Sequence, residues 1–180
     1  MRTNNRTTAL LLAALLGLSQ CKKNEQAPAD QLPPATQTGA NTLGCLVNGQ
    51  PWTPQGYDGS SNYSVSYDPS YRLGTLNIAA YRYANSQAKR QTIGIFSDSL
   101  LPGPGRYKLR QLGHHGAALD DFQGNCIYDR TSAGAYCRGE LIITRLDRAA
   151  GIISGTFSFT LAKLGCDTVR VTQGRFDKRL

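Results

Sequence analysis

GIISGTFSFTL, residues 151–161, alternates between apolar and hydroxyl-bearing side chains. Ile153, Phe157 and Leu161 fall on one phase of the alternation, whereas Ser154 and Ser158 fall on the other. A period of two residues is that of a β-strand with one face in a core and the other in water. Weaker copies of the pattern occur at residues 75–80, 92–95 and 168–172. The sequence therefore predicts an all-β domain.

Turn-forming residues separate these alternating runs, for example at Asn48-Gly49, Asp58-Gly59, Asp68-Pro69 and residues 102–105. Short antiparallel strands at this spacing predict a β-sandwich or a barrel-like domain, and the pattern does not separate the two. We find no convincing helix pattern in the mature chain. About nine strands are expected, around residues 43–47, 62–67, 73–83, 91–97, 106–110, 125–129, 135–146, 152–161 and 167–177.

Gly174 interrupts the last expected strand. Phe176 falls on the other phase from Val171, so that a regular strand would place the two apolar side chains on opposite faces. A β-bulge at this glycine would restore both to the core.

The N-terminus has the pattern of a cleaved signal peptide. Arg2 and Arg6 precede an apolar run at residues 9–18. Ten residues of helix rise only about 15 Å, against roughly 30 Å of bilayer hydrocarbon, so the run is too short to span a membrane. We expect residues 1–20 to be removed as a secretory signal.

Cys21 closes that signal. Leu18-Ser19-Gln20-Cys21 resembles the lipobox of bacterial lipoproteins, in which the cysteine is lipidated and becomes the first residue of the mature chain. The resemblance implies acyl chains such as palmitate on Cys21 and membrane anchoring, with the outer membrane the expected location.

Two segments make up the mature chain. Residues 21–41 begin with the lipidated cysteine, are rich in proline and polar residues, and are expected to form a disordered tether. Residues 42–180 are long enough to bury a core as one domain.

The chain is basic, with a formal net charge of +8 and 20 Lys and Arg against 12 Asp and Glu. Its basic residues are scattered along the sequence, which favours an ordinary solvated surface. For an exported protein the alternatives are anionic lipid headgroups, acidic polysaccharides or no partner at all, and we expect no nucleic acid.

Five cysteines are present, and four remain after Cys21: Cys45, Cys126, Cys137 and Cys166. An even number in an exported domain indicates disulfides. If residues 130–133 turn a hairpin, Cys126 lies opposite Cys137 at bonding distance. Cys45 with Cys166 then follows by elimination.

Four motifs lie at residues 41–52 (NTLGCLVNGQPW), 141–147 (LIITRLD), 153–159 (ISGTFSF) and 174–177 (GRFD). Together they resemble an uncharacterised family of Bacteroidota lipoproteins, a domain of unknown function. The resemblance covers most of residues 41–180 and implies an all-β envelope domain, without implying catalytic or binding residues.

Aromatic residues are concentrated at residues 52–71. Aromatic rings with a polar tip suit sugar rings and protein interfaces, although such rings also pack within sheets. The candidate ligand-stacking residues are Trp52, Tyr57, Tyr63 and Tyr67.

Residues of catalytic or metal-binding type form no recognisable motif. His114 and His115 are the two histidines, in a glycine-rich stretch at residues 111–124 that also contains Asp120 and Asp121. Adjacent histidines in a strand point to opposite faces, so we interpret this stretch as a polar surface loop rather than a metal site. We predict no catalytic residue, metal or cofactor.

These observations lead to one functional expectation. The chain is expected to be a lipid-anchored envelope protein whose β domain is not an enzyme and binds a glycan or another envelope component. A structural or assembly role in an envelope complex is the alternative, and an unrecognised hydrolase is third.

Overall fold

A computed structural model describes residues 26–180 except 84, 86, 123 and 133. These residues form two antiparallel sheets that pack as a sandwich-like all-β domain, which confirms the predicted fold class. The six-stranded sheet has the order β2-β1-β11-β10-β9-β6, and the five-stranded sheet has the order β3-β4-β5-β7-β8. The strands are β1 Thr42–Val47, β2 Gln50–Trp52, β3 Tyr63–Asp68, β4 Thr75–Arg82, β5 Gln91–Ser97, β6 Gly105–Arg110, β7 His115–Asp121, β8 Cys126–Tyr128, β9 Tyr136–Asp147, β10 Ile152–Lys163 and β11 Cys166–Arg179.

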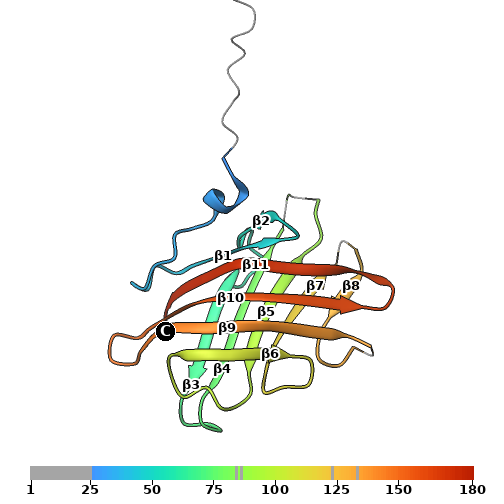
Figure 1. Ribbon diagram of the computed structural model, residues 1–180. Coiled ribbons are helices and arrows are strands. Elements are labelled where there is room, and N and C mark those ends of the chain that lie inside the picture. The colour runs from blue at the N-terminus through green and yellow to red at the C-terminus, as the bar shows by residue number, and fades with distance from the viewer. Residues whose placement is uncertain (1–25, 84, 86, 123, 133) are drawn as a thin grey trace, which may run out of the picture.

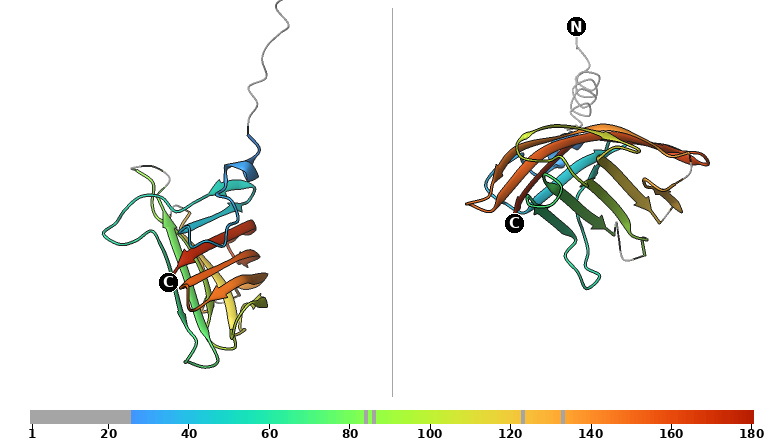
Figure 2. Two further views of the ribbon diagram at one scale, coloured as in Figure 1. Left: turned by 90° about the vertical axis from the view of Figure 1, so that its left-hand side faces the viewer. Right: turned by 90° about the horizontal axis from the view of Figure 1, so that it is seen from below.

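The two sheets lie face to face, with their strands crossing steeply (Figure 1). Seen from below, the six-stranded sheet arches over the other sheet (Figure 2). Side chains on the two inner faces form one core that includes Ile95, Leu141 and Phe157. The outer face of the six-stranded sheet is thus left as a broad surface.

The bulge expected at Gly174 is confirmed. Phe157 pairs with Gly174 but Phe159 pairs with Val171, so β11 carries one extra residue at this point. A side chain at position 174 would collide with Phe157, because its Cβ would lie 2.3 Å from the Phe157 ring. Val171 and Phe176 are both buried as a result.

Two strands were missed by the pattern. β2 is three residues long and contains Pro51, which is tolerated because β2 is an edge strand. The prediction of a surface loop at residues 111–124 is wrong, because β7 lies inside the five-stranded sheet between β5 and β8. The hydrophobic alternation of β7 is weak because position 116 must be glycine. A Cβ there would lie 2.4 Å from the Phe96 ring.

The predicted hairpin that joins Cys126 to Cys137 is also wrong. β8 pairs with β7 in one sheet, whereas β9 pairs with β10 and β6 in the other. Cys126 instead forms a disulfide with Cys166, at a Cα–Cα distance of 6.0 Å. This bond ties the two sheets together at one end, and a disulfide of this kind is typical of proteins outside the cytoplasm.

Cys45 and Cys137 are free and buried, so neither takes part in the predicted pairs. Burial raises the pKa of the Cys45 thiol to about 12 and also raises that of Cys137. Since the thiolate is the reactive form, both side chains act as small apolar groups in the core.

The N-terminal segment at residues 26–41 packs against the domain, in contrast to the disordered tether expected over 21–41. It begins with a short 3-10 helix, η1 (Pro28–Gln31), and then buries Leu32. It also lies on Gly44 of β1, because a Cβ at that glycine would meet the Pro33 ring at 2.6 Å. The expected signal peptide and Cys21 lie outside the described residues.

Asp177 of β11 fixes this segment. Its carboxylate is only 1% exposed and accepts hydrogen bonds from the Thr36 hydroxyl (2.7 Å) and from the backbone N–H groups of Thr38 (2.9 Å), Gly39 (2.8 Å) and Ala40 (3.0 Å). Burial acts to raise the pKa of Asp177, but these hydrogen bonds outweigh it and hold the pKa below its ordinary value.

Replacing Asp177 with asparagine should lower the free energy of unfolding at pH 7 by roughly 2–3 kcal/mol, the scale of hydrogen bonds to a charged group. Because the pKa of the folded state is depressed, the stabilisation is present above the ordinary value of 3.8 and is lost as the pH falls through the folded value. Urea unfolding from pH 7 to pH 2 measures this. Asp30→Asn, at an exposed position of η1, serves as the control, and equal pH profiles for the two variants would contradict the assignment.

Candidate cationic sheet face

The outer face of the six-stranded sheet gathers basic side chains that are far apart in the sequence. Leu109, Leu141 and Val171 point into the core. Because side chains alternate along a strand, their neighbours on the same strands point outward. β6 contributes three of these side chains, β9 one and β11 two. This cationic face consists of Arg106, Lys108, Arg110, Arg138, Arg170 and Arg175.

The strand register sets these side chains in rows across the sheet. Arg110 lies opposite Arg138, which lies opposite Thr160, which in turn lies opposite Arg170. Like charges directly opposite one another destabilise a sheet. The pairing of Arg110 with Arg138 therefore has a cost in stability that an anionic ligand would remove.

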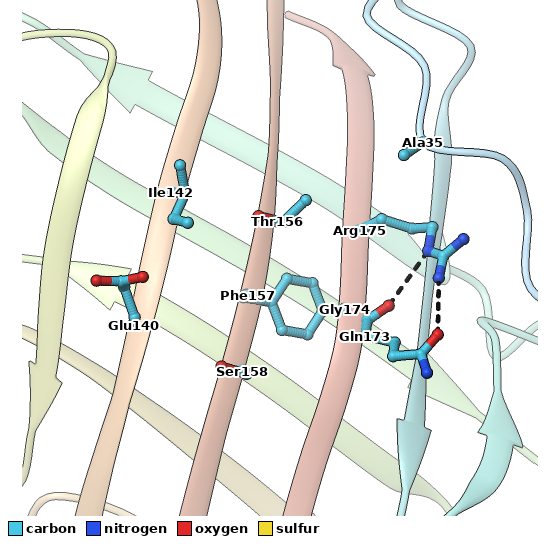
Figure 3. A pocket seen from close by; sticks show the side chains of 9 residues that line it. All are labelled: Ala35, Glu140, Ile142, Thr156, Phe157, Ser158, Gln173, Gly174 and Arg175. Carbon is cyan, nitrogen blue, oxygen red and sulfur yellow. Dashed lines mark hydrogen bonds between the residues drawn. The ribbon is translucent and has the colours of Figure 1, made fainter. Parts of the chain in front are cut away.

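A hollow of about 420 Å³ lies in the middle of this face (Figure 3). Glu140 and Ile142 of β9, Thr156 and Ser158 of β10 and Arg175 of β11 surround it. Its volume falls in the range of small-molecule sites. Hydroxyl, carboxylate and guanidinium groups together suit a polar ligand with several hydroxyl groups.

Contacts to neighbouring groups hold two of the charges around the hollow. Glu140 pairs with Arg106 of the neighbouring strand β6 at 2.7 Å. The Arg175 guanidinium donates to the Gln173 carbonyl (3.2 Å) and to the Pro33 carbonyl of the N-terminal segment (3.5 Å). Ala35 of the same segment lines the hollow. The packed N-terminal segment thus forms one wall of the candidate site.

Acidic residues concentrate instead in and beside the five-stranded sheet. On the cationic face, Glu140 is paired with Arg106, and Asp177 is covered by the N-terminal segment. Two acids of the five-stranded sheet form ion pairs with arginines of the same sheet and its loops, Asp58 with Arg90 and Asp98 with Arg130, so the excess of positive charge lies on the six-stranded sheet. The acidic residues of the five-stranded sheet and its loops are Asp58, Asp68, Asp98, Asp120, Asp121 and Asp129.

The expectation of scattered basic residues missed this face. A local signal was present in β6, where Arg106, Lys108 and Arg110 alternate with Tyr107 and Leu109. The remaining members come from β9 and β11, and only the strand order and register bring them to the same surface.

The predicted ligand-stacking set does not assemble. Trp52 and Tyr63 are 1% and 5% exposed and belong to the core, and half-buried Tyr67 packs against it. These large rings fill space between the two sheets. Tyr57 is the exception, at 79% exposed.

Tyr57 lines a separate open pocket of about 470 Å³ with Gln55 and Tyr83. The Tyr83 ring lies against Gly56, where a Cβ would approach it to 3.0 Å. Of the predicted ligand-stacking residues, only Tyr57 lines this pocket.

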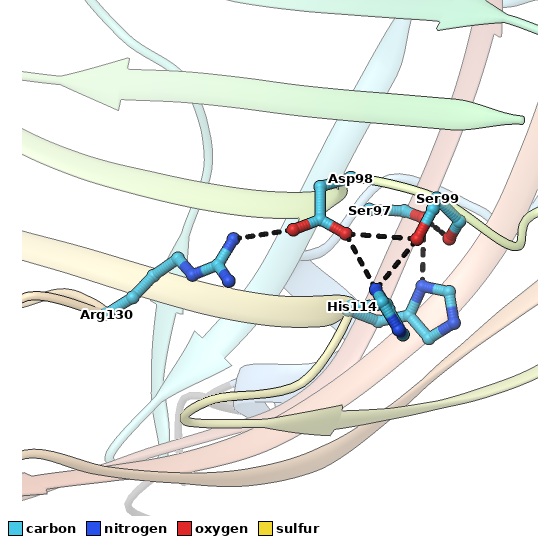
Figure 4. A network of polar contacts seen from close by, with 6 residues as sticks. Ser97, Asp98, Ser99, His114 and Arg130 are labelled. Atoms are coloured by element: carbon cyan, nitrogen blue, oxygen red, sulfur yellow. Dashed lines mark hydrogen bonds and ion pairs between the residues drawn. The ribbon is translucent and has the colours of Figure 1, made fainter. Parts of the chain in front are cut away.

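His114 immediately precedes β7, and His115 is the first residue of that strand. His115 is half-buried and packs edge-on against Tyr107 at 5.1 Å between ring centroids. His114 points outward, where its Nδ1 contacts the Ser99 hydroxyl at 2.8 Å and the Asp98 carboxylate at 3.0 Å (Figure 4). Asp120 is five pairs from His115 along the β5–β7 ladder, opposite Thr92.

The Ser99–His114–Asp98 contacts differ from those of a hydrolase. In a catalytic triad the hydroxyl and the carboxylate contact different ring nitrogens, so that the ring can relay a proton. Here both contact Nδ1, and Ser99 is itself buried. The His114 hydrogen bond, reinforced by Arg130, holds the pKa of Asp98 at about 2. The cluster joins the turn after β5 to the residue before β7.

Within residues 26–180, apart from the four gaps, no group of three His, Cys, Asp or Glu is placed to hold a metal ion. The same part of the chain contains no helix of the length and hydropathy needed to cross a membrane.

Comparison of the chain with family models, with curated proteins and with solved structures found no match.

Proposed function

We propose that this chain is a lipid-anchored envelope protein whose β domain binds an anionic glycan without catalysing a reaction. The observation that carries the proposal is the cationic face, with a hollow lined by hydroxyl groups at its centre. The anchor would be Cys21, as the lipobox resemblance implies.

The side chains around the hollow fit an acidic sugar better than a simple anion. Arg175 and Lys108 supply positive charge on opposite sides of β9 and β10. Thr156 and Ser158 can exchange hydrogen bonds with sugar hydroxyls, and the Glu140 carboxylate can accept one. Glu140 would repel a densely charged anion such as polyphosphate, which favours a polymer that alternates charge with hydroxyl groups.

The test uses polygalacturonate as the acidic glycan and dextran as the neutral one. A chain that starts at Lys22 retains every contact described above, and its melting curve checks that it is folded. Polygalacturonate should bind and dextran should not, with the affinity falling as salt is raised because the contacts are exposed. Equal binding of both polymers, or binding insensitive to salt, would contradict the proposal.

A further inference from the structure

One end of the six-stranded sheet carries exposed apolar side chains next to the cationic face. Leu164 is 92% exposed at the turn between β10 and β11, and Leu112 is 85% exposed in the turn after β6. Tyr136, at the start of β9, is 47% exposed and faces outward, since its neighbour Cys137 is in the core. We call Leu112, Tyr136 and Leu164 the apolar rim.

The register places the apolar rim beside three arginines. Arg110 pairs with Arg138, and Leu112 and Tyr136 each lie two residues beyond this pair. Tyr136 pairs with Ala162, two residues before Leu164. The turns and strand ends that carry the rim lie together at the right-hand end of the sheet in Figure 1. Arg110, Arg138 and Arg170 therefore form a cationic row one step, about 7 Å, behind the rim.

We propose that this end of the sheet docks on an anionic lipid surface, a contact that is separate from both the glycan hollow and the Cys21 anchor. Peripheral proteins bury apolar side chains about 5–10 Å into the boundary between headgroups and acyl chains. With the rim at that depth, the cationic row stands at the level of the lipid phosphates. Arginine is the side chain best suited to bind phosphate through two hydrogen bonds.

The shape of the rim favours a bilayer over a folded partner. Its two leucines protrude from turns, and a fluid bilayer accepts such tips without a preformed hollow for each. The Cys126–Cys166 disulfide lies two residues from Leu164 and joins this end of the two sheets. The rim is thus presented on a cross-linked part of the fold. Two acids lie near this end, Asp167 at the start of β11 and Asp129, whose carbonyl accepts a hydrogen bond from Gln111 beside Leu112. The row sets three arginines against them.

The experiment measures co-sedimentation of the chain from Lys22 with vesicles, so that neither the signal peptide nor the acyl chains contribute. Vesicles of phosphatidylglycerol with phosphatidylethanolamine should bind the protein, and phosphatidylcholine vesicles should not. Leu112→Ser with Leu164→Ser should lower partitioning about 10- to 100-fold, the scale of two leucines leaving an apolar environment. Arg110→Gln with Arg138→Gln should lower it about 10-fold.

Matched controls lie at another end of the fold. Tyr71→Ser with Leu73→Ser removes two exposed apolar side chains from the turn between β3 and β4. Arg72→Gln with Arg148→Gln removes the same charge as the arginine pair. Neither control should change partitioning by more than about twofold.

Three outcomes would overturn the proposal. The first is equal binding to anionic and neutral vesicles, and the second is an equal loss in the controls. The third is sedimentation of the wild-type protein as a dimer and of the leucine variant as a monomer. That result would assign the rim to contact with a second copy of this chain. The leucine variant should still bind polygalacturonate. Loss of vesicle binding alone thus separates this proposal from the glycan site.

Discussion

Replacing Trp52 with alanine should lower the free energy of unfolding by about 3–5 kcal/mol, the scale for truncating a buried tryptophan. Trp52 is 1% exposed on the inner face of β2, opposite Cys45. The Arg82 guanidinium of the other sheet lies 5.5 Å from its ring centroid. Loss of the indole would leave a cavity between the two sheets and remove this cation–π contact.

Denaturant unfolding of Trp52→Ala, with Tyr57→Ala as the control, measures the effect. Tyr57 is 79% exposed, so its truncation should change the free energy of unfolding by less than about 0.5 kcal/mol. The Trp52 variant should still bind polygalacturonate while it is folded. A stable Trp52 variant that has lost glycan binding would return this residue to the ligand-stacking role expected from the sequence.

Replacing Lys108 and Arg175 with glutamine should weaken polygalacturonate binding about 10-fold at low salt. Each exposed ion contact contributes about 0.2–1 kcal/mol, and 1.4 kcal/mol corresponds to a factor of ten. Because salt screens the contacts, the difference between variant and wild type should shrink at high salt. Isothermal titration calorimetry across a salt series measures the affinity of each protein and its dependence on salt.

The matched control is Arg72→Gln with Arg148→Gln, which removes the same charge away from the hollow. An equal loss of affinity in the control would mean that net charge alone, rather than the face, attracts the polymer. A second readout comes from Arg138→Gln, which relieves the opposition of Arg110 and Arg138. It should keep or slightly raise the melting temperature, because cross-strand pairs contribute only about 0.2–1 kcal/mol and this pair is of like charge.

The sequence allowed the strand content and the bulge of β11 to be predicted because both are local. The alternation in residues 151–161 and the phase change at Gly174 are properties of neighbouring residues along one strand. β7 escaped detection because packing against Phe96 requires Gly116, and its short apolar run lacks β-branched side chains. A strand whose residues must be small to make room for neighbouring side chains gives little hydrophobic signal.

The disulfide and the candidate site depend on contacts between distant parts of the chain. Cys126 and Cys166 meet only because β8 and β11 belong to different sheets that are packed together. Asp177 gave no signal of its role, since its partners at residues 36–40 are backbone and hydroxyl groups of a segment with the composition of a linker. The cationic face likewise follows from the register of four strands.

Mapping the bound glycan on the domain would locate the binding site. Amide chemical shifts of the folded chain would be followed by NMR as polygalacturonate oligomers are added. We expect the largest shifts around the hollow, in the strand segments that carry Lys108, Glu140, Ser158 and Arg175. Shifts confined to the pocket beside Tyr57 and Tyr83, with the cationic face unchanged, would contradict this expectation.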